Sequence, residues 1–471
     1  MREQVRFLVV ALIAALAAAL LPAAAVAAKG KPTPRKAGTL DRSFSDDGVL
    51  TSTLSDGGTV HLALGPDGEI AVARGAAVPQ GSVVLEYDPD GRRRREFGEN
   101  GRLLIEDPGG SLFGLTGIAL DSTGRLLVGG TSYGEMMAPP FPQGTNLWRT
   151  AATVARYSGR GHLDGSFGEA GYFRSDLGLP RPTTAPPGPG ADGQTPTYTY
   201  PGTSLEASGI SVDARGRVAI TGSAVTEAHL CYPGSYERFT DAFVAQLTES
   251  GSLDPAFAST GVVSDPRYEF AAAPRFRADG RLFVFETSGR CLRGSHGSGA
   301  LVMRRGGFLD GAYGEGGYAD LGPLAESPSA LAAANASGLA FVLYPSEEYW
   351  YRSLGRFLPN GQPDGKVKIE RWDKSSPELI GIDARGRALV VGRKRANGGY
   401  TVLRVERFTP DGLRDSSFGR RGVSSVAFQQ GQVKPTAIGV DARGRILVAG
   451  QYFPPGDAAG SELFVVRLRG R

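Results

Sequence analysis

The chain has 471 residues, of which 68 are Gly and 31 are Pro, with 21% charged residues, 41% apolar residues and a formal net charge of +4. Glycine and proline together make up about one residue in five, against about one in eight in an average protein. The apolar content excludes a disordered chain, and so many helix breakers exclude a helical bundle or a doubly wound α/β enzyme. An all-β protein with many tight turns remains.

Residues 1–28 are typical of a secretory signal peptide. Arg2 and Arg6 form its positive start, residues 7–21 are apolar, and the small residues at 25–27 form an Ala-x-Ala cleavage site. We therefore expect an exported protein that is secreted or associated with the cell envelope.

The alternative for this leader is an anchor that is not cleaved, because residues 7–28 are almost continuously apolar and long enough to cross a bilayer. After removal of the signal we expect no stable membrane span. Residues 29–39 then form a short basic linker that contains Pro. The arginine run at 92–95 lies at a predicted turn without interleaved aromatic residues, so we expect a solvated turn there and no nucleic-acid partner.

A repeated signature organises the rest of the chain. It consists of Leu-Asp, an aromatic residue three positions after the Asp, and a glycine four positions after the aromatic residue, in full at 40–48, 163–171, 253–261 and 309–317 and in looser form at 95–101 and 413–422. We expect the aromatic residue to pack between repeats and the Asp to accept a hydrogen bond within its own turn. The aromatic and glycine positions are Phe44/Gly48, Phe97/Gly101, Phe167/Gly171, Phe257/Gly261, Tyr313/Gly317 and Phe418/Gly422.

Three further strands accompany each copy of this signature. An apolar stretch, a glycine turn and a second apolar stretch predict a β-hairpin. Its seven copies lie at 60–73, 117–130, 209–222, 276–286, 330–344, 379–392 and 437–450. One more apolar strand that ends in a turn follows each hairpin. Its copies lie at 82–91, 152–161, 241–251, 300–307, 353–361, 400–412 and 462–471.

Four strands in each of seven repeats predict a seven-bladed β-propeller over residues 40–471. A linear solenoid is the alternative. The chain ends after the third strand of its last repeat and supplies a fourth strand near its start, at about 48–53. We therefore expect this N-terminal strand to pair with 462–469, which completes the last blade and removes both free edges.

These motifs resemble those of the bacterial delta-60 repeat proteins, whose unit carries LDxSFGxxG, a glycine-turn hairpin and a strand that ends in NPDG. The resemblance covers residues 40–471 and implies an exported bacterial repeat protein of propeller type. It implies no common activity and no catalytic residues. The fifth repeat departs from the pattern because it has lost LDxxFG.

One face of the expected propeller carries the insertions. They fall at 131–150, 175–208, 223–240 and 287–299, whereas the turns on the opposite face are uniformly short. Long loops on a rigid scaffold commonly bind ligands, and Tyr and Trp suit carbohydrate or protein recognition. The alternative role for these aromatic side chains is to pack the loops onto the blades. The candidate ligand-binding residues are Tyr133, Trp148, Tyr198, Tyr200, Tyr232, Tyr349, Trp350 and Tyr452.

Cys231 and Cys291 fall in insertions of neighbouring blades. In an exported chain this placement predicts a disulfide. His229 and His296 lie beside them, so a Cys₂His₂ zinc site is the weaker alternative, and two free thiols are the third. We expect no other metal and no cofactor.

The sequence therefore predicts a monomeric binding module whose partner is a protein or glycan of the cell envelope. An extracellular hydrolase or lyase with its site at the central opening of the same face is the alternative, and a structural envelope component is a third. The match of residues 130–134 to GxSxG is accidental, because no helix follows that a nucleophile elbow could open. No catalytic residue is assigned.

Overall fold

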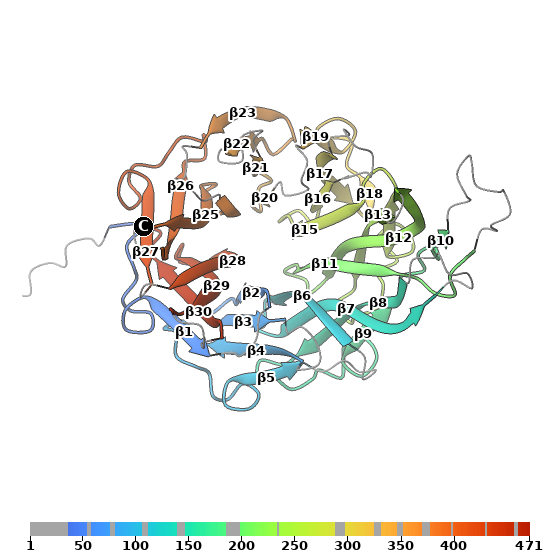
Figure 1. Ribbon diagram of the computed structural model, residues 1–471, viewed down its shortest axis with the longest axis horizontal. Helices are drawn as coiled ribbons and strands as arrows, with labels where there is room; N and C mark the ends of the chain where they lie inside the picture. Colours follow the sequence, from blue (N-terminus) through green and yellow to red (C-terminus); the bar gives the residue numbers. More distant parts are fainter. Residues whose placement is uncertain are drawn as a thin grey trace, which may run out of the picture. The chain divides into compact units, whose positions relative to one another are not determined.

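The computed structural model describes residues 36–53, 58–75, 81–105, 112–138, 147–184, 198–232, 235–287, 297–324, 331–345, 352–369, 377–396, 399–428, 431–455 and 460–471. In these residues all regular structure is β-strand, and the strands form seven sheets that follow one another around a ring (Figure 1). The prediction of a seven-bladed β-propeller is confirmed.

Each sheet is one blade, numbered here in chain order. Blade 1 contains β2 (Val60–Leu64), β3 (Ile70–Arg74), β4 (Ser82–Tyr87) and β5 (Arg102–Ile105). Blade 2 contains β6 (Leu112–Leu120), β7 (Leu126–Met137), β8 (Leu147–Tyr157) and β9 (Tyr172–Ser175). Blade 3 contains β11 (Leu205–Val212), β12 (Val218–Tyr232), β13 (Ser235–Leu247), β14 (Val262–Asp265) and the added parallel strand β10 (Thr183–Thr184).

The other four blades have the same order. Blade 4 contains β15 (Phe270–Phe276), β16 (Leu282–Thr287), β17 (Gly297–Arg305), β19 (Tyr318–Leu324) and the short β18 (Phe308–Leu309). Blade 5 contains β20 (Leu331–Ala334), β21 (Ala340–Pro345), β22 (Arg352–Phe357) and β23 (Pro363–Lys368). Blade 6 contains β24 (Pro377–Ile382), β25 (Ala388–Arg395), β26 (Thr401–Phe408) and β27 (Val423–Ala427). Blade 7 contains β28 (Gln432–Val440), β29 (Ile446–Phe453), β30 (Glu462–Leu468) and β1 (Val49–Thr53).

The last blade closes the ring as predicted. β1 pairs antiparallel with β30 over five residue pairs, from Val49 with Val466 to Thr53 with Glu462. The segment Lys36–Thr39 also differs from the expected linker. The backbone N–H of Gly38 donates to the carbonyl oxygen of Arg469 at 2.7 Å, so Lys36–Thr39 belong to the propeller.

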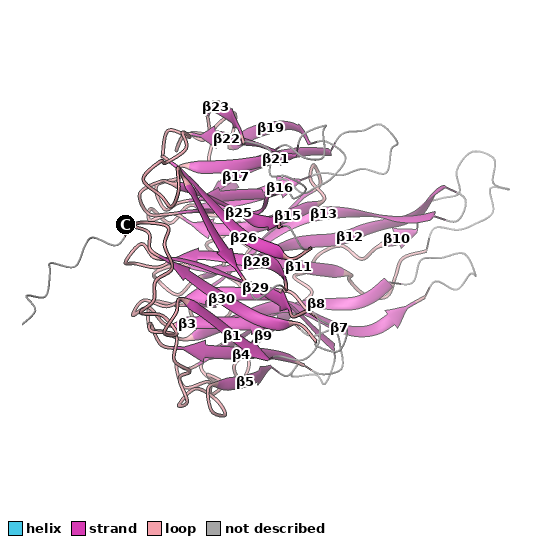
Figure 2. Cartoon of the chain, turned by 60° about the vertical axis from the view of Figure 1, so that its left-hand side comes forward, coloured by secondary structure: helices cyan, strands magenta, loops and turns pink. Residues whose placement is uncertain are grey.

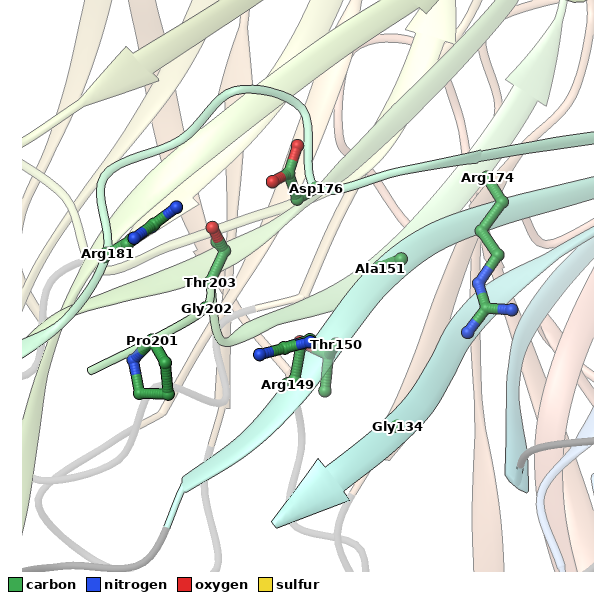
Figure 3. A pocket seen from close by; sticks show the side chains of 10 residues that line it. All are labelled: Gly134, Arg149, Thr150, Ala151, Arg174, Asp176, Arg181, Pro201, Gly202 and Thr203. Atoms are coloured by element: carbon green, nitrogen blue, oxygen red, sulfur yellow. The ribbon is translucent and has the colours of Figure 1, made fainter. Parts of the chain in front are cut away.

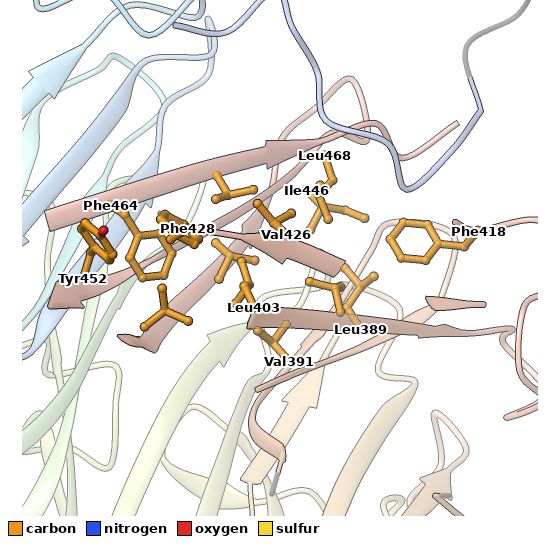
Figure 4. Packing of buried hydrophobic residues seen from close by; sticks show 14 of the residues in the cluster. Leu389, Val391, Leu403, Phe418, Val426, Phe428, Ile446, Tyr452, Phe464 and Leu468 are labelled. Carbon is orange, nitrogen blue, oxygen red and sulfur yellow. The ribbon is translucent and has the colours of Figure 1, made fainter. Parts of the chain in front are cut away.

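The hydrophobic core is divided among the seven interfaces between blades. Each main cluster of buried side chains takes its members from two successive blades, and Figure 4 shows the cluster between blades 6 and 7. The six aromatic residues of the repeated signature are all buried at these interfaces. Their predicted packing role is confirmed.

Next to each of these aromatic residues a backbone N–H crosses to the following blade. The N–H of Gly168 donates to the carbonyl oxygen of Ser250 at 2.7 Å, with Gly168 in the left-handed region at φ +54°. The equivalent bonds run from Ser45 to Asp90, Gly98 to Arg160, Ala258 to Gly306, Gly314 to Asn360 and Gly419 to Ala37, at 2.8, 2.9, 2.8, 2.5 and 2.8 Å. We call this contact the interblade bond.

The Asp of the signature has two tasks. As predicted, it caps its own turn: Asp164 Oδ1 accepts from the backbone N–H of Ser166 at 3.1 Å. Its other oxygen accepts from Arg156 Nε at 2.8 Å, and that guanidinium lies over the Phe167 ring at 4.7 Å. Arg156 Nη1 also donates to the carbonyl oxygen of Glu249 in the next blade at 2.6 Å. Arg407 and Arg467 repeat this arrangement in blades 6 and 7.

Blade 1 carries the same ion pair with its charges exchanged. Glu86 stands where Arg156 stands in blade 2, and Arg94 stands where Asp164 stands; their side chains bond at 2.8 Å. Glu86 is 1% exposed, and burial raises the pKa of its carboxyl to about 7 although Arg94 lies beside it. Arg94 therefore belongs to a buried pair, whereas the sequence indicated only a solvated turn at 92–95.

We expect removal of β1 to unfold the ring. A chain that begins at Gly58 loses Phe44 and Leu50 from a buried cluster and exposes the edge of β30. Loss of one buried Phe costs about 3–5 kcal/mol, which in a chain of this size lowers the unfolding midpoint by about 3–5 °C, and loss of the whole strand should lower it further. A chain that begins at Lys36 is the matched control and should keep the midpoint of the full chain in calorimetry. Equal midpoints for the two truncations would contradict ring closure by β1.

We expect that the two charges of the blade 1 ion pair can be exchanged, to the order found in blade 2, without a large loss of stability. Glu86→Arg alone places two buried arginines face to face and should cost about 3–5 kcal/mol of unfolding free energy. Adding Arg94→Asp recreates the pair of blade 2 over Phe97 and should recover most of that loss. Urea denaturation of both variants checks this, with the exposed Arg92→Glu as control. A double variant no more stable than the single one would show that the pair does not act as a unit.

Candidate functional site

Two hairpins extend beyond the other strands on one side of the ring (Figure 2). β7–β8 and β12–β13 run through much of the segments 131–150 and 223–240, which the sequence indicated as loops. The difference has a physical reason: cross-strand pairs such as Met136 with Trp148 continue the ladder, which satisfies backbone groups that a loop would leave to water.

A second core joins these two hairpins. It contains Met137 and Leu147 of blade 2, Val225 of blade 3, and Tyr200. Tyr200 belongs to the connecting segment between blades 2 and 3, of which residues 176–184 and 198–204 are described. Two backbone hydrogen bonds hold the connecting segment beside this core. The N–H of Val225 donates to the carbonyl oxygen of Ser204 at 2.8 Å, and the N–H of Tyr200 donates to the carbonyl oxygen of Pro182 at 2.9 Å. The insertion at 175–208 is therefore built into the scaffold where the structure describes it.

The candidate aromatic residues divide between core and surface. Tyr200 and Tyr452 are buried, and Tyr452 packs on Phe428 with ring centroids 5.4 Å apart, which is the packing role that the sequence allowed as the alternative. Tyr198 is partly buried, edge-on to Tyr200 at 5.2 Å, and Tyr133 is half-buried. Trp148 is 41% exposed on β8.

The cysteine prediction is not decided by the described residues. His229, Cys231 and Tyr232 lie at the end of β12, whose side chains are not described there. Cys291, His296, Tyr349 and Trp350 lie outside the described residues. The disulfide and the zinc site therefore stay predictions. In the part of the chain that the structure describes, no three His, Cys, Asp or Glu side chains are grouped as a metal site would require.

A polar cleft of about 360 Å³ lies between β8, β9 and the connecting segment (Figure 3). We call it the arginine cleft. Its lining residues are Gly134, Arg149, Thr150, Ala151, Arg174, Asp176, Arg181, Pro201, Gly202 and Thr203. In Figure 3, Arg149 and Arg181 lie toward one end of the cleft and Arg174 toward the other.

Hydrogen bonds between the two blades hold the walls of the arginine cleft. Thr150 Oγ1 donates to the carbonyl oxygen of Leu205 at 2.7 Å and accepts from the N–H of the same residue at 2.5 Å. The N–H of Thr150 donates to the carbonyl oxygen of Thr203 at 3.0 Å. The cleft is thus preformed by buried bonds between β8 and the start of blade 3.

The electrostatics of the cleft are positive. Three arginines and one aspartate line it, and within the described residues none of the guanidinium groups of Arg149, Arg174 and Arg181 has an ion-pair or hydrogen-bond partner. Asp176 Oδ1 accepts from the backbone N–H of Gly178 at 3.1 Å, which leaves Oδ2 to face a ligand. Such a set can bind an oxyanion and a hydroxyl group together.

Sequence reasoning did not single out these arginines. Arg149, Arg174 and Arg181 come from two strands and the connecting segment, and no motif links them. The one sequence feature that could have pointed to the cleft is that Arg149 directly follows the candidate binding residue Trp148. Because successive strand residues point to opposite faces, the two side chains serve different surfaces.

The innermost strands carry the titratable residues that the hydrolase or lyase alternative would need. Glu206 on β11 belongs to blade 3 and Glu378 on β24 belongs to blade 6, so the two are not on neighbouring blades. Glu378 accepts a hydrogen bond from Arg393 at 2.7 Å.

No family model and no curated protein matches the chain, so the resemblance to the delta-60 repeat proteins stays a prediction. Solved structures with a similar fold include a polysaccharide lyase, Uly1 (8% identity, TM-score 0.45), for which the match covers 92% of this chain and 98% of the lyase. A protein of unknown function from Dyadobacter fermentans shares 12% identity at a TM-score of 0.37, over 90% of this chain and 100% of that one. The soluble aldose sugar dehydrogenase of Escherichia coli shares 10% sequence identity at a TM-score of 0.37. The match covers 73% of this chain and 96% of the dehydrogenase.

These likenesses carry no inference about activity, because the identities and TM-scores are low. Among the described residues no helix is long and apolar enough to cross a membrane.

His61 on β2 is a histidine within the ring. Burial lowers the pKa of its imidazole from 6.5 to about 4, and its buried Nε2 has no hydrogen-bond partner in the described part of the chain. The folded protein therefore holds His61 neutral in a range where the unfolded chain protonates it.

We expect His61 to destabilise the fold in acid. Because its folded pKa lies below its unfolded pKa, stability is fully present above pH 6.5 and is lost as the pH falls toward 4. The urea midpoint of His61→Leu should therefore fall less than that of the unsubstituted protein between pH 7 and pH 4.5. An equal fall in both would show that His61 does not contribute.

Proposed function

We propose that this chain is an exported binding module of the delta-60 repeat type that recognises an envelope protein or glycan through the face that carries the long hairpins. The observation that carries the proposal is the paired exposure of Met136 and Trp148, which are 54% and 41% exposed and face each other across β7 and β8. Export rests on the predicted signal peptide at 1–28.

The surroundings of this pair support a binding role. A single exposed apolar side chain is common, and Leu163 and Leu413 on the opposite face are such cases at repeated turn positions. Met136 and Trp148 instead form a cross-strand pair, and their neighbours Met137 and Leu147 are buried in the second core. The pair is thus held in place before any partner arrives, which lowers the entropic cost of binding.

The hydrolase or lyase alternative has less support in the geometry. It requires acid and base groups that converge on one point, whereas Glu378 on its inner strand is already paired with Arg393. A structural envelope component remains distinct from both, because it would need no ligand at this face.

We expect Trp148→Ala combined with Met136→Ser to reduce capture of the envelope partner at least tenfold, since a buried Trp at an interface commonly contributes more than about 2 kcal/mol. Pull-down from solubilised envelope and a glycan array measure capture. Leu413→Ser is the matched control, because it removes an exposed apolar side chain, 65% exposed, from the opposite face.

Folding of both variants is checked by their unfolding midpoints, which should match that of the unsubstituted chain because the changed side chains are exposed. Recognition through this face would be contradicted if Trp148→Ala combined with Met136→Ser left capture unchanged. It would also be contradicted if Leu413→Ser reduced capture equally.

A further inference from the structure

We propose that the arginine cleft is a subsite for an acidic polysaccharide, in which the arginines hold a carboxylate or sulfate group of the sugar and Asp176 accepts one of its hydroxyl groups. This inference rests on the proposed function and names the ligand chemistry of the same face. It stands on the charge, the polar atoms and the rigidity of the cleft.

The charge of the cleft is not neutralised by the protein. Elsewhere in the ring the arginines of the interfaces are paired, as Arg156 is with Asp164 at 2.8 Å and Arg407 with Asp415 at 2.8 Å. In the cleft, the side chains of Arg149, Arg174 and Arg181 are exposed to solvent and have no such partner among the described residues. The guanidinium group is a planar fork of donors that fits carboxylate and sulfate oxygens in pairs.

Asp176 narrows the class of ligand. The Asp176 carboxylate accepts hydrogen bonds from sugar hydroxyl groups, and neither a simple inorganic anion nor the carboxylates of an acidic peptide supply such donors. Its Oδ1 is held by the N–H of Gly178 at 3.1 Å, so Oδ2 is the atom presented to the ligand. An acidic sugar supplies both partners, the anion for the arginines and the hydroxyl for Asp176.

The placement of the arginines favours a polymer over a single sugar. Arg174 lies toward one end of the cleft and Arg149 and Arg181 toward the other (Figure 3), so anionic groups on successive sugar units can be held at both ends. The cleft of about 360 Å³ is in the size range of small-molecule sites. The bonds from Thr150 to Leu205 and Thr203 fix the backbone of the wall between β8 and the start of blade 3, so this wall needs no rearrangement to accept a ligand.

The test is calorimetric titration of the full chain with tetragalacturonate and a chondroitin sulfate tetrasaccharide, with neutral maltotetraose, inorganic sulfate, an oligoglutamate peptide and duplex DNA for comparison. We expect one acidic oligosaccharide to bind at micromolar concentration with an affinity that falls as salt rises. Binding of the carboxylated or the sulfated sugar identifies which anion the cleft prefers.

Variants then locate the binding. Arg174→Gln and Arg181→Gln should each weaken binding of the acidic oligosaccharide at least tenfold, whereas Arg215→Gln, an exposed arginine in a turn of the opposite face, should leave it unchanged. Asp176→Ala removes both the charge and the acceptor oxygens, so it should strengthen binding of inorganic sulfate and weaken that of the oligosaccharide, which a purely electrostatic attraction would not produce.

The proposal is overturned if no acidic oligosaccharide binds, if the arginine variants bind as well as the Arg215 variant, or if the peptide or the DNA binds as tightly with the same dependence on Arg174 and Arg181. Its failure is distinguishable from that of the proposed function. Oligosaccharide binding with blank envelope capture would remove only the proposed function, and partner capture that depends on Trp148 but not on the arginines would remove only the subsite.

Discussion

The structure depends on one contact that is repeated around the ring: a buried aromatic side chain with a backbone N–H beside it that bonds to the carbonyl oxygen of the next blade. In blade 2 these are Phe167 and the bond from Gly168 to Ser250 at 2.7 Å. Each blade alone has two apolar faces, which it can bury only against its neighbours. The interblade bond sets the position of that packing, and a buried N–H without it would cost about 1–3 kcal/mol. Because each blade buries its apolar faces against its neighbours, the hydrophobic core is divided among the interfaces between blades.

Some blades depart from the repeated signature, yet at the equivalent positions other residues make a comparable bond. The position of the bond is therefore kept although the residue type changes. Blade 1 keeps its ion pair with the charges exchanged between Glu86 and Arg94. Blade 5 has lost the LDxxFG signature, yet Arg356 still donates from Nε to the carbonyl oxygen of Pro410 in blade 6 at 2.5 Å. Where the chain ends after blade 7, Ala37 supplies the carbonyl oxygen that a turn would otherwise provide to Gly419. Different residues thus satisfy the same geometric demand.

This contact also decides which face is free to carry function. The signature lies in the turn between the third and fourth strands, so that face must keep its short turns to reach the next blade. The opposite face has no such demand, and there β7–β8 and β12–β13 lengthen while the connecting segment adds a second core around Tyr200. The arginine cleft and the exposed Trp148 both arise from these additions. The interblade contacts therefore constrain the face with the short turns, and the variable elements lie on the opposite face.

The sequence by itself determined the blade count, the strand order and the closure of the ring by 48–53, because these depend on local turn chemistry and alternation that recur along the chain. It also identified the insertion-bearing face, since loop length is read directly from the spacing of the repeats. Only the tertiary structure decided which aromatic residues are exposed, as Trp148 is, and which are core, as Tyr200 and Tyr452 are. It alone brought Arg149, Arg174 and Arg181 to one cleft. The reason is physical: burial and electrostatic convergence depend on contacts between segments distant in the chain, and no local pattern records them.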